Sequence, residues 1–207
     1  LGAGAWADCG APAVQGEAAH LLAADVLKDH FGSAAERVGV LLLRRGPLSV
    51  QDIMRFSSDG ASFEEEALGF ARVRNALLAL VQHGVCDGRA HPQAANNDAF
   101  KGMLQVYAVD IEEVLVRLRF PQFLEHCYYT YGEVSHELLS VVLKHGRVSA
   151  EFAIAEVKRV YDQMFSRDGG ATISEGDLEE EFGRLVTERL LRPVEPSGAS
   201  SSSSSAG

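Results

Sequence analysis

The stretches LLLRRGPLS (residues 41–49) and VVLKHGRVS (residues 141–149) repeat one pattern at two places in the chain. In each, apolar and basic residues precede a glycine, and a serine stands three residues after that glycine. A glycine after a helix commonly takes a left-handed conformation, and a serine commonly begins the next helix. The repeat therefore predicts the same helix–turn–helix junction twice. Two unrelated helical hairpins with a common stop signal remain the alternative.

Helical periodicity surrounds the first repeat. Helices are expected over 17–30 and 33–45, separated by Gly32, and a short one over 50–56 begins at Ser49. Ser33 with Glu36, and Ser62 with Glu65, have the spacing of capping boxes. The second box predicts a long helix over 63–83. Residues expected to face the core are Leu21, Leu22, Val26, Leu27, Val38, Leu41, Leu42, Phe70, Val73, Leu77, Leu80 and Val81.

Strand signals follow this helix. Residues 85–90 and 101–109 have strand composition, and turn-forming residues fill the loop over 91–98. Helices, a helix–turn–helix junction and then a two-stranded ribbon is the order of a winged helix-turn-helix domain.

The second half repeats the helices but not the ribbon. Helices are expected over 110–119, 122–131, 133–145, 150–165 and 174–191, with Phe120-Pro121 interrupting the first two. Ser149 is the expected cap of the fourth. No strong strand pattern follows the last helix. The core-facing residues are expected to be Ile111, Val114, Leu115, Leu118, Leu178, Phe182, Leu185 and Leu190.

These patterns predict a mainly α fold with a small β-ribbon, made of tandem winged helix-turn-helix domains. The expected division is a disordered N-terminal segment over 1–16, a first winged-helix domain over 17–109 and a second over 110–193. A serine-rich low-complexity tail over 194–207 completes it. A first residue that is not Met suggests a fragment or an incomplete gene model.

Composition narrows the function. The formal net charge of the 207 residues is −10, which disfavours general binding of polyanions. No P-loop, dinucleotide fingerprint or nucleophile elbow occurs, so no catalytic residue, cofactor or metal site is expected. The stretch over 166–177 resembles a calcium loop, but Ala171 stands where that loop needs glycine and Asp177 where it needs glutamate.

Nucleic-acid contact has two candidate places. On the long helix, Arg72 and Asn75 are expected on the outer side and Arg74 nearer the edge of the apolar stripe. Glu64 and Glu65, on the same outer side, would repel phosphate. Arg89 and Lys101 flank the expected wing tip. The last helix begins with many acids, so the second domain is interpreted as a protein-binding module.

An aromatic stretch, FPQFLEHCYYTYGE, offers a different surface. Its aromatic side chains could stack on bases, but aromatics at helical spacing are more often core residues or anchors of protein interfaces. The protein-interface candidates are Phe120, Phe123, Tyr128, Tyr129 and Tyr131.

Four phrases resemble a known family, the tandem winged-helix subunits of RNA polymerase III, in their N-terminal part. That subunit is the largest member of the enzyme's peripheral initiation heterotrimer and is related in architecture to the alpha subunit of TFIIE. The resemblance spans residues 20–193, and LVQH with RLRFPQF are its most specific parts. The phrases are LKDHFGSAAERVGVLLLRRG (27–46), ALLALVQHGV (76–85), VLVRLRFPQF (114–123) and YGEVSHELLSVVLKHGRVS (131–149).

The resemblance implies a nuclear, non-catalytic subunit that helps transcription initiation and promoter opening. Its implied partners are the other heterotrimer subunits, the clamp-bearing large subunit and, weakly, promoter DNA; no membrane is implied. A free-standing winged-helix regulator that binds duplex DNA is the alternative, and an adaptor in another complex is a third interpretation.

Overall fold

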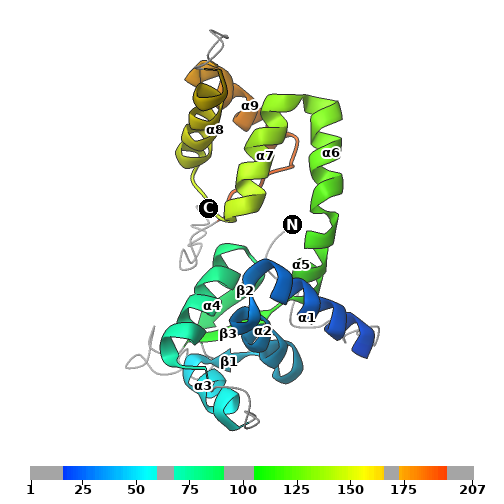
Figure 1. Ribbon diagram of the computed structural model, residues 1–207, viewed down its shortest axis with the longest axis vertical. Helices are drawn as coiled ribbons and strands as arrows, with labels where there is room; N and C mark the ends of the chain where they lie inside the picture. Colours follow the sequence, from blue (N-terminus) through cyan, green and yellow to red (C-terminus); the bar gives the residue numbers. More distant parts are fainter. Residues whose placement is uncertain (1–15, 60–67, 91–104, 166–172, 195–207) are drawn as a thin grey trace, which may run out of the picture. The chain divides into compact units, whose positions relative to one another are not determined.

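The structure, a computed structural model, describes residues 16–59, 68–90, 105–165 and 173–194. The chain divides into two compact units, residues 1–120 and 121–207. The described residues of both units are mainly helical, and those of the first include a three-stranded antiparallel sheet (Figure 1). The predicted fold class, mainly α with a small β-ribbon in a winged-helix arrangement, is confirmed.

The first unit is a helical core followed by a wing. The helices α1, α2 and α3 lead into α4, and α5 with a short 3-10 helix follows the sheet. The Ser49 hydroxyl accepts a 3.2 Å hydrogen bond from the Asp52 N–H, so Ser49 caps α3 as predicted. The bounds are α1 Glu17–Phe31, α2 Ser33–Arg45, α3 Val50–Asp59, α4 Phe70–Gln82, α5 Ile111–Val116 and the 3-10 helix Arg117–Arg119.

The sheet has the order β1-β3-β2, so the last strand in sequence lies at its centre. β2 (Cys86–Ala90) and β3 (Gln105–Val109) form the predicted ribbon, with Gly88 opposite Tyr107. β1 (Leu48–Ser49) pairs with β3 on its other side and was not predicted. Two residues are too few to show alternation, so only long-range pairing reveals this strand.

The core of the first unit joins every one of its helices. Fully buried side chains include Leu27 of α1, Val38 of α2, Ile53 of α3 and Leu80 of α4. Gly39 of α2 lies against Leu27: a Cβ at Gly39 would stand 2.5 Å from Leu27 Cδ1. The absence of a side chain there lets α1 and α2 pack closely.

The described residues of the second unit form four helices. Its core is formed by buried residues of all four, among them Cys127, Leu138, Val157 and Leu185. Ser149 caps α8 and Ser174 caps α9, through hydrogen bonds of 3.2 Å from the backbone N–H of Phe152 and Asp177. No strand occurs among its described residues, 121–165 and 173–194. The bounds are α6 Phe120–Tyr131, α7 Glu133–His145, α8 Ala150–Phe165 and α9 Glu175–Thr187.

The two units repeat one design at an offset of 100 residues. Gly46 and Gly146 follow α2 and α7, with φ of 81° and 78°, and each donates its N–H to the carbonyl four residues earlier. Gly32 and Gly132 precede the same helices with φ of 83° and 95°. Burial classes agree position by position between 31–40 and 131–140. The duplicated junction is therefore present, although ψ of −160° and −127° puts Gly46 and Gly146 outside the left-handed helical region that was expected.

The helix over 110–119 packs differently from the prediction. Ile111 and Val114 lie in the core of the first unit rather than the second. Leu118 was expected inward but is 49% exposed, whereas Arg117 is buried. The helix tightens to 3-10 geometry at Arg117, and a 3-10 helix turns further per residue than an α-helix, so the inward position shifts. The predicted boundary between a first domain over 17–109 and a second over 110–193 stays a prediction.

Other differences concern helix faces and starts. Leu21 and Leu22 of α1 are 58% and 44% exposed, so the inward stripe is Ala23, Val26 and Leu27 instead. Ser33 makes no cap, because Gly32 occupies the capping position. The α9 helix ends at Thr187 instead of residue 191.

The start of α4 was also predicted wrongly. α4 begins at Phe70 after Gly69, not at residue 63. Phe70 was expected inward but is exposed, whereas Leu68, which precedes the helix, is buried. The segments 60–67, 91–104 and 166–172 lie outside the described residues, with the second capping box, the wing loop and the calcium-like loop. Most of 1–16 and 194–207 lies outside them too.

Candidate interaction surfaces

Helix α4 stands where the recognition helix of a winged-helix domain is expected. Arg72 and Asn75 are exposed on it, as predicted, and Arg74, which was expected nearer the edge of the apolar stripe, is exposed too. Its 13 residues contain these two arginines and no carboxylate. Glu64 and Glu65, which were expected on the same helix, precede its start. The exposed side of α4 is therefore basic, in contrast to the acidic composition of the chain.

Two large apolar side chains share this exposed side. Phe70 and Leu78 are 56% and 54% exposed, and they stand four residues before and after Arg74. Residues four apart lie one above the other along a helix. Phe70, Arg74 and Leu78 therefore form a row along α4, here called the α4 row.

The wing contributes one further predicted residue. Arg89 lies on β2 and is exposed. Lys101, the other wing candidate, falls outside the described residues. The contact of Lys101 with nucleic acid stays a prediction.

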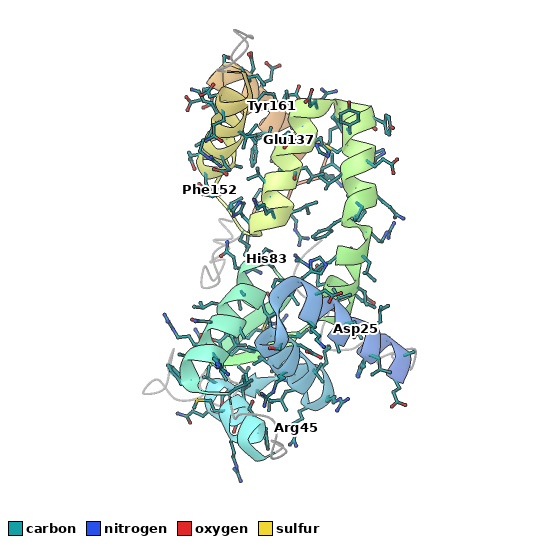
Figure 2. All side chains as sticks on the ribbon, in the orientation of Figure 1. Asp25, Arg45, His83, Glu137, Phe152 and Tyr161 are labelled. Carbon is teal, nitrogen blue, oxygen red and sulfur yellow. The ribbon has the colours of Figure 1, made fainter. Side chains whose placement is uncertain are left out.

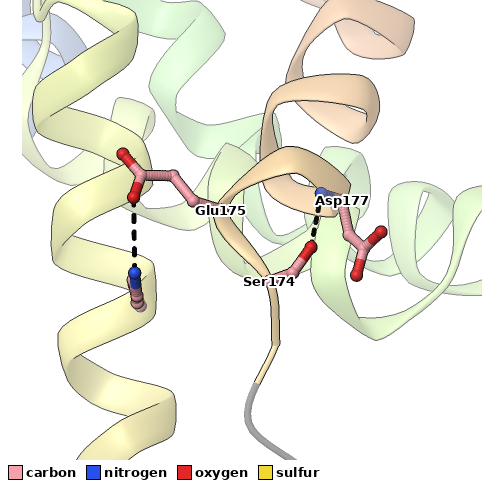
Figure 3. A network of polar contacts seen from close by, with 4 residues as sticks. Ser174, Glu175 and Asp177 are labelled. Atoms are coloured by element: carbon pink, nitrogen blue, oxygen red, sulfur yellow. Dashed lines mark hydrogen bonds and ion pairs between the residues drawn. The ribbon is translucent and has the colours of Figure 1, made fainter.

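Helix α9 occupies in the second unit the place that α4 has in the first, but its charge is opposite. It contains five carboxylates, from Glu175 to Glu181, and one arginine, Arg184. Ser174 caps its start, and Glu175 Oε2 lies 3.3 Å from Lys158 Nζ of α8 (Figure 3). Acids suit the first turn of a helix but oppose docking on phosphates.

Two further contacts fix α9 within its unit. The buried Ser135 hydroxyl of α7 donates a 2.6 Å hydrogen bond to Glu181 Oε2. The Arg184 guanidinium lies 5.1 Å from the centre of the Tyr131 ring. Tyr161 of α8 is buried (Figure 2), and burial, followed by the charges of Glu133 and Glu137, raises the pKa of its phenol.

The predicted aromatic set separates into exposed and half-buried members. Tyr128 and Tyr129 are 49% and 78% exposed, and their rings meet edge to face at 5.5 Å. Phe120, Phe123 and Tyr131 are half-buried. Tyr128 and Tyr129 are therefore the most exposed members of this set, and the interface role of the whole set stays a prediction.

Sequence reasoning missed a cluster of aromatic rings around one buried arginine in the first unit. The buried Arg117 guanidinium lies 4.7 Å from the Phe31 ring centre and 4.9 Å from that of Phe120. His83, labelled in Figure 2, meets Phe31 edge to face at 5.1 Å. Desolvation lowers the pKa of Arg117, and desolvation followed by the Arg117 charge lowers the pKa of His30. Phe120, three residues after Arg117, is the one local signal in the sequence, whereas the contact with Phe31 of α1 depends on the tertiary fold.

The described residues hold neither a cluster of metal ligands nor a membrane-spanning helix. There, no three His, Cys, Asp or Glu side chains gather as metal ligands would. Over the same residues, no helix has the length and hydropathy needed to cross a membrane.

Comparison with known proteins shows similarity to subunits of RNA polymerase III. A family model described as the RNA polymerase III subunit RPC82 helix-turn-helix domain matches residues 21–87, from α1 into β2. The DNA-directed RNA polymerase III subunit RPC3 of Danio rerio is 27% identical over 182 residues, which are 86% of this chain and 30% of the relative. The Homo sapiens RPC3 subunit is 25% identical over 168 residues, 81% of this chain and 28% of the relative.

A relative from a third organism gives the same result. The rpc3 subunit of Dictyostelium discoideum is 23% identical over 178 residues, 82% of this chain and 26% of that protein. The chain thus spans less than a third of the length of these curated relatives. Together the matches confirm the resemblance predicted from the sequence and support an RPC3-type subunit.

Proposed function

We propose that this chain, as part of an RPC3-type subunit of RNA polymerase III, is a non-catalytic component that helps transcription initiation and promoter opening. It acts by docking on other polymerase subunits and makes only weak local contact with DNA. The proposed partners are the other members of the peripheral heterotrimer and the clamp-bearing large subunit. The proposed location is the nucleus.

The opposite charges of α4 and α9 support this proposal. α9 has five carboxylates against one arginine, so its exposed side repels a phosphate backbone. α4 carries only Arg72 and Arg74, and Arg89 is the third described candidate. Three phosphate contacts give a slope of log affinity against log salt of about −3. This slope is much less steep than that of a dedicated DNA-binding protein.

Affinity purification of the tagged chain from nuclei, followed by mass spectrometry, tests the assignment. Subunits of RNA polymerase III are expected to co-purify in stoichiometric amounts. Anisotropy titration of the purified chain with a 20-base-pair duplex is expected to show weak binding that disappears as salt rises. Recovery of the chain without any polymerase subunit would contradict the proposal.

The basic side of α4 favours a second candidate, a free-standing regulator that binds duplex DNA. Such a protein would bind a duplex tightly by itself and with a steep salt dependence. Arg72→Ala and Arg74→Ala would then each weaken binding strongly. Under the main proposal these substitutions change an already weak affinity by a small factor.

A further inference from the structure

We propose that the α4 row, Phe70, Arg74 and Leu78 with Arg72 beside it, is the docking surface for a partner protein's helix that carries apolar side chains flanked by carboxylates. This inference rests on the proposed function and names the chemistry of one partner. It concerns the face of α4 that is turned away from the core of the first unit.

The spacing of the α4 row fits a helix as the occupant. Its three residues cover eight steps of the helix, or about 12 Å at 1.5 Å per residue. Phe70 and Leu78 are eight residues, about two helical turns, apart. They can therefore contact the apolar anchors that a partner's amphipathic helix presents at i and i+7. Phe70 and Leu78 would supply the apolar contacts, and Arg74 stands between them.

Charge complementarity selects a carboxylate-bearing partner. α4 has two arginines and no carboxylate, within a chain whose net charge is −10. A guanidinium binds a carboxylate through two parallel hydrogen bonds. Aromatic residues and arginine are also the types most enriched at the centres of protein interfaces.

Exposed apolar side chains favour a protein over DNA as the occupant. Phe70 and Leu78 each leave more than half of the side chain in water, where large apolar groups are costly. A phosphate backbone offers them no apolar surface, whereas a helix bearing Leu or Phe does. In the second unit, α9 carries none of the exposed large apolar side chains found in the described residues. The α4 row is therefore specific to the first unit.

Site-specific photo-crosslinking in the assembled polymerase tests the occupant. Leu78 is replaced by a benzoyl-phenylalanine side chain, and Thr187 on exposed α9 serves as the control position. The expected adduct at Leu78 maps to a helical segment of another subunit with Asp or Glu within one turn of an apolar residue. An adduct to promoter DNA, or adducts within this chain alone, would overturn the inference.

A charge exchange with peptides provides the second test. Two 16-residue helical peptides carry Leu at positions i, i+3 and i+7, with Glu flanking them in one and Lys in the other. The purified chain is expected to bind the Glu peptide about tenfold more tightly. Arg74→Glu should reverse this preference and Leu78→Ser should weaken both. Arg55→Glu, an identical charge change at an exposed position of α3, should leave the Glu peptide bound as before.

The outcomes separate the two proposals. If polymerase subunits co-purify but Arg74→Glu does not change peptide preference, the inference fails and the proposed function stands. If no polymerase subunit co-purifies, the proposed function fails, and the peptide titrations alone decide what the α4 row binds.

Discussion

The Ser135 hydroxyl and the Glu181 carboxylate, 46 residues apart in sequence, form a 2.6 Å hydrogen bond that joins α7 to α9. Ser135 has no exposed surface, so this bond is made away from water on one side. Glu181 is thereby held inward, while the other four carboxylates of α9 remain exposed. Of the five acids on that helix, Glu181 thus stabilises the packing of α9 on α7.

Ser135→Ala is expected to destabilise the second unit. It removes a hydrogen bond to a charged acceptor and leaves Glu181 without that donor, which costs about 1.5–3 kcal/mol. Urea unfolding followed by circular dichroism measures the change. Ser140→Ala, at a half-buried position of the same helix, provides the control and should change the free energy of unfolding much less. Equal losses from both variants would contradict a specific role for the bond.

Gly39→Ala is expected to destabilise the first unit by about 1–3 kcal/mol, as overpacking of a close-packed core does. The new Cβ would stand 2.5 Å from Leu27 Cδ1, so α1 and α2 must separate or Leu27 must change rotamer. Gly183→Ala, in α9, is the matched control because no atom lies within 4 Å of its Cβ position. There the substitution should stabilise by about 0.5–1 kcal/mol, since alanine favours helix. The urea midpoint is expected to fall in Gly39→Ala and to rise in Gly183→Ala.

Gly46→Ala and Gly146→Ala should each be destabilising for the same backbone reason. Their φ values of 81° and 78° lie in a region that residues with a Cβ adopt at a cost of about 1–3 kcal/mol. Space is not the cause at Gly46, where no atom lies within 4 Å of the Cβ position. Thermal unfolding of the two variants should therefore show comparable losses. A neutral Gly46→Ala would refute the backbone explanation.

Arg117→Met is expected to raise the pKa of His30, measured by NMR titration. The Arg117 charge is the second cause of the lowered pKa, and desolvation is the first, so the pKa should rise without reaching its ordinary value near 6.5. A lowered histidine pKa makes the folded state lose stability as the pH falls below about 6.5. The variant should show a smaller loss between pH 7 and pH 5. An unchanged His30 pKa would rule out the electrostatic coupling.

Alkaline pH is expected to weaken the second unit through Cys127. Burial, followed by the charge of Glu181, raises the pKa of its thiol above the ordinary value of 9.0. A raised pKa gives stability that is complete below the unfolded value and is lost as the pH rises through the folded one. Cys127→Ala should therefore flatten the decline of the free energy of unfolding above pH 9. An identical alkaline slope in the variant would contradict the assignment.

The local signals in the sequence were sufficient for the junctions but not for the faces. Gly46, Gly146, Ser49 and Ser149 act through their own backbone or through a residue three positions away, so their spacing predicts their role. The face of a helix depends on what packs against it. Leu21 and Leu22 are apolar at suitable spacing, yet no other described element covers them, and they remain exposed.

The candidate surfaces show the same limit. The exposed positions of Arg72 and Asn75 on α4 were predicted correctly, because charged and amide side chains rarely face a core. The start of α4 was missed, since Ser62 with Glu65 fits a cap as well as Gly69 does. That error put Glu64 and Glu65 on the helix and made its charge look mixed. Arg117 was missed because its burial follows from the local 3-10 geometry and two rings.

The offset between the two units gives experimenters a pair of twin positions for every residue from 31 to 40. A fluorine or spin label placed at one residue and then at the residue one hundred further on enters the same burial class in both units. Any difference between the two signals then reports chemistry around the label rather than depth in the fold. The label in one unit thus serves as the internal reference for the label in the other.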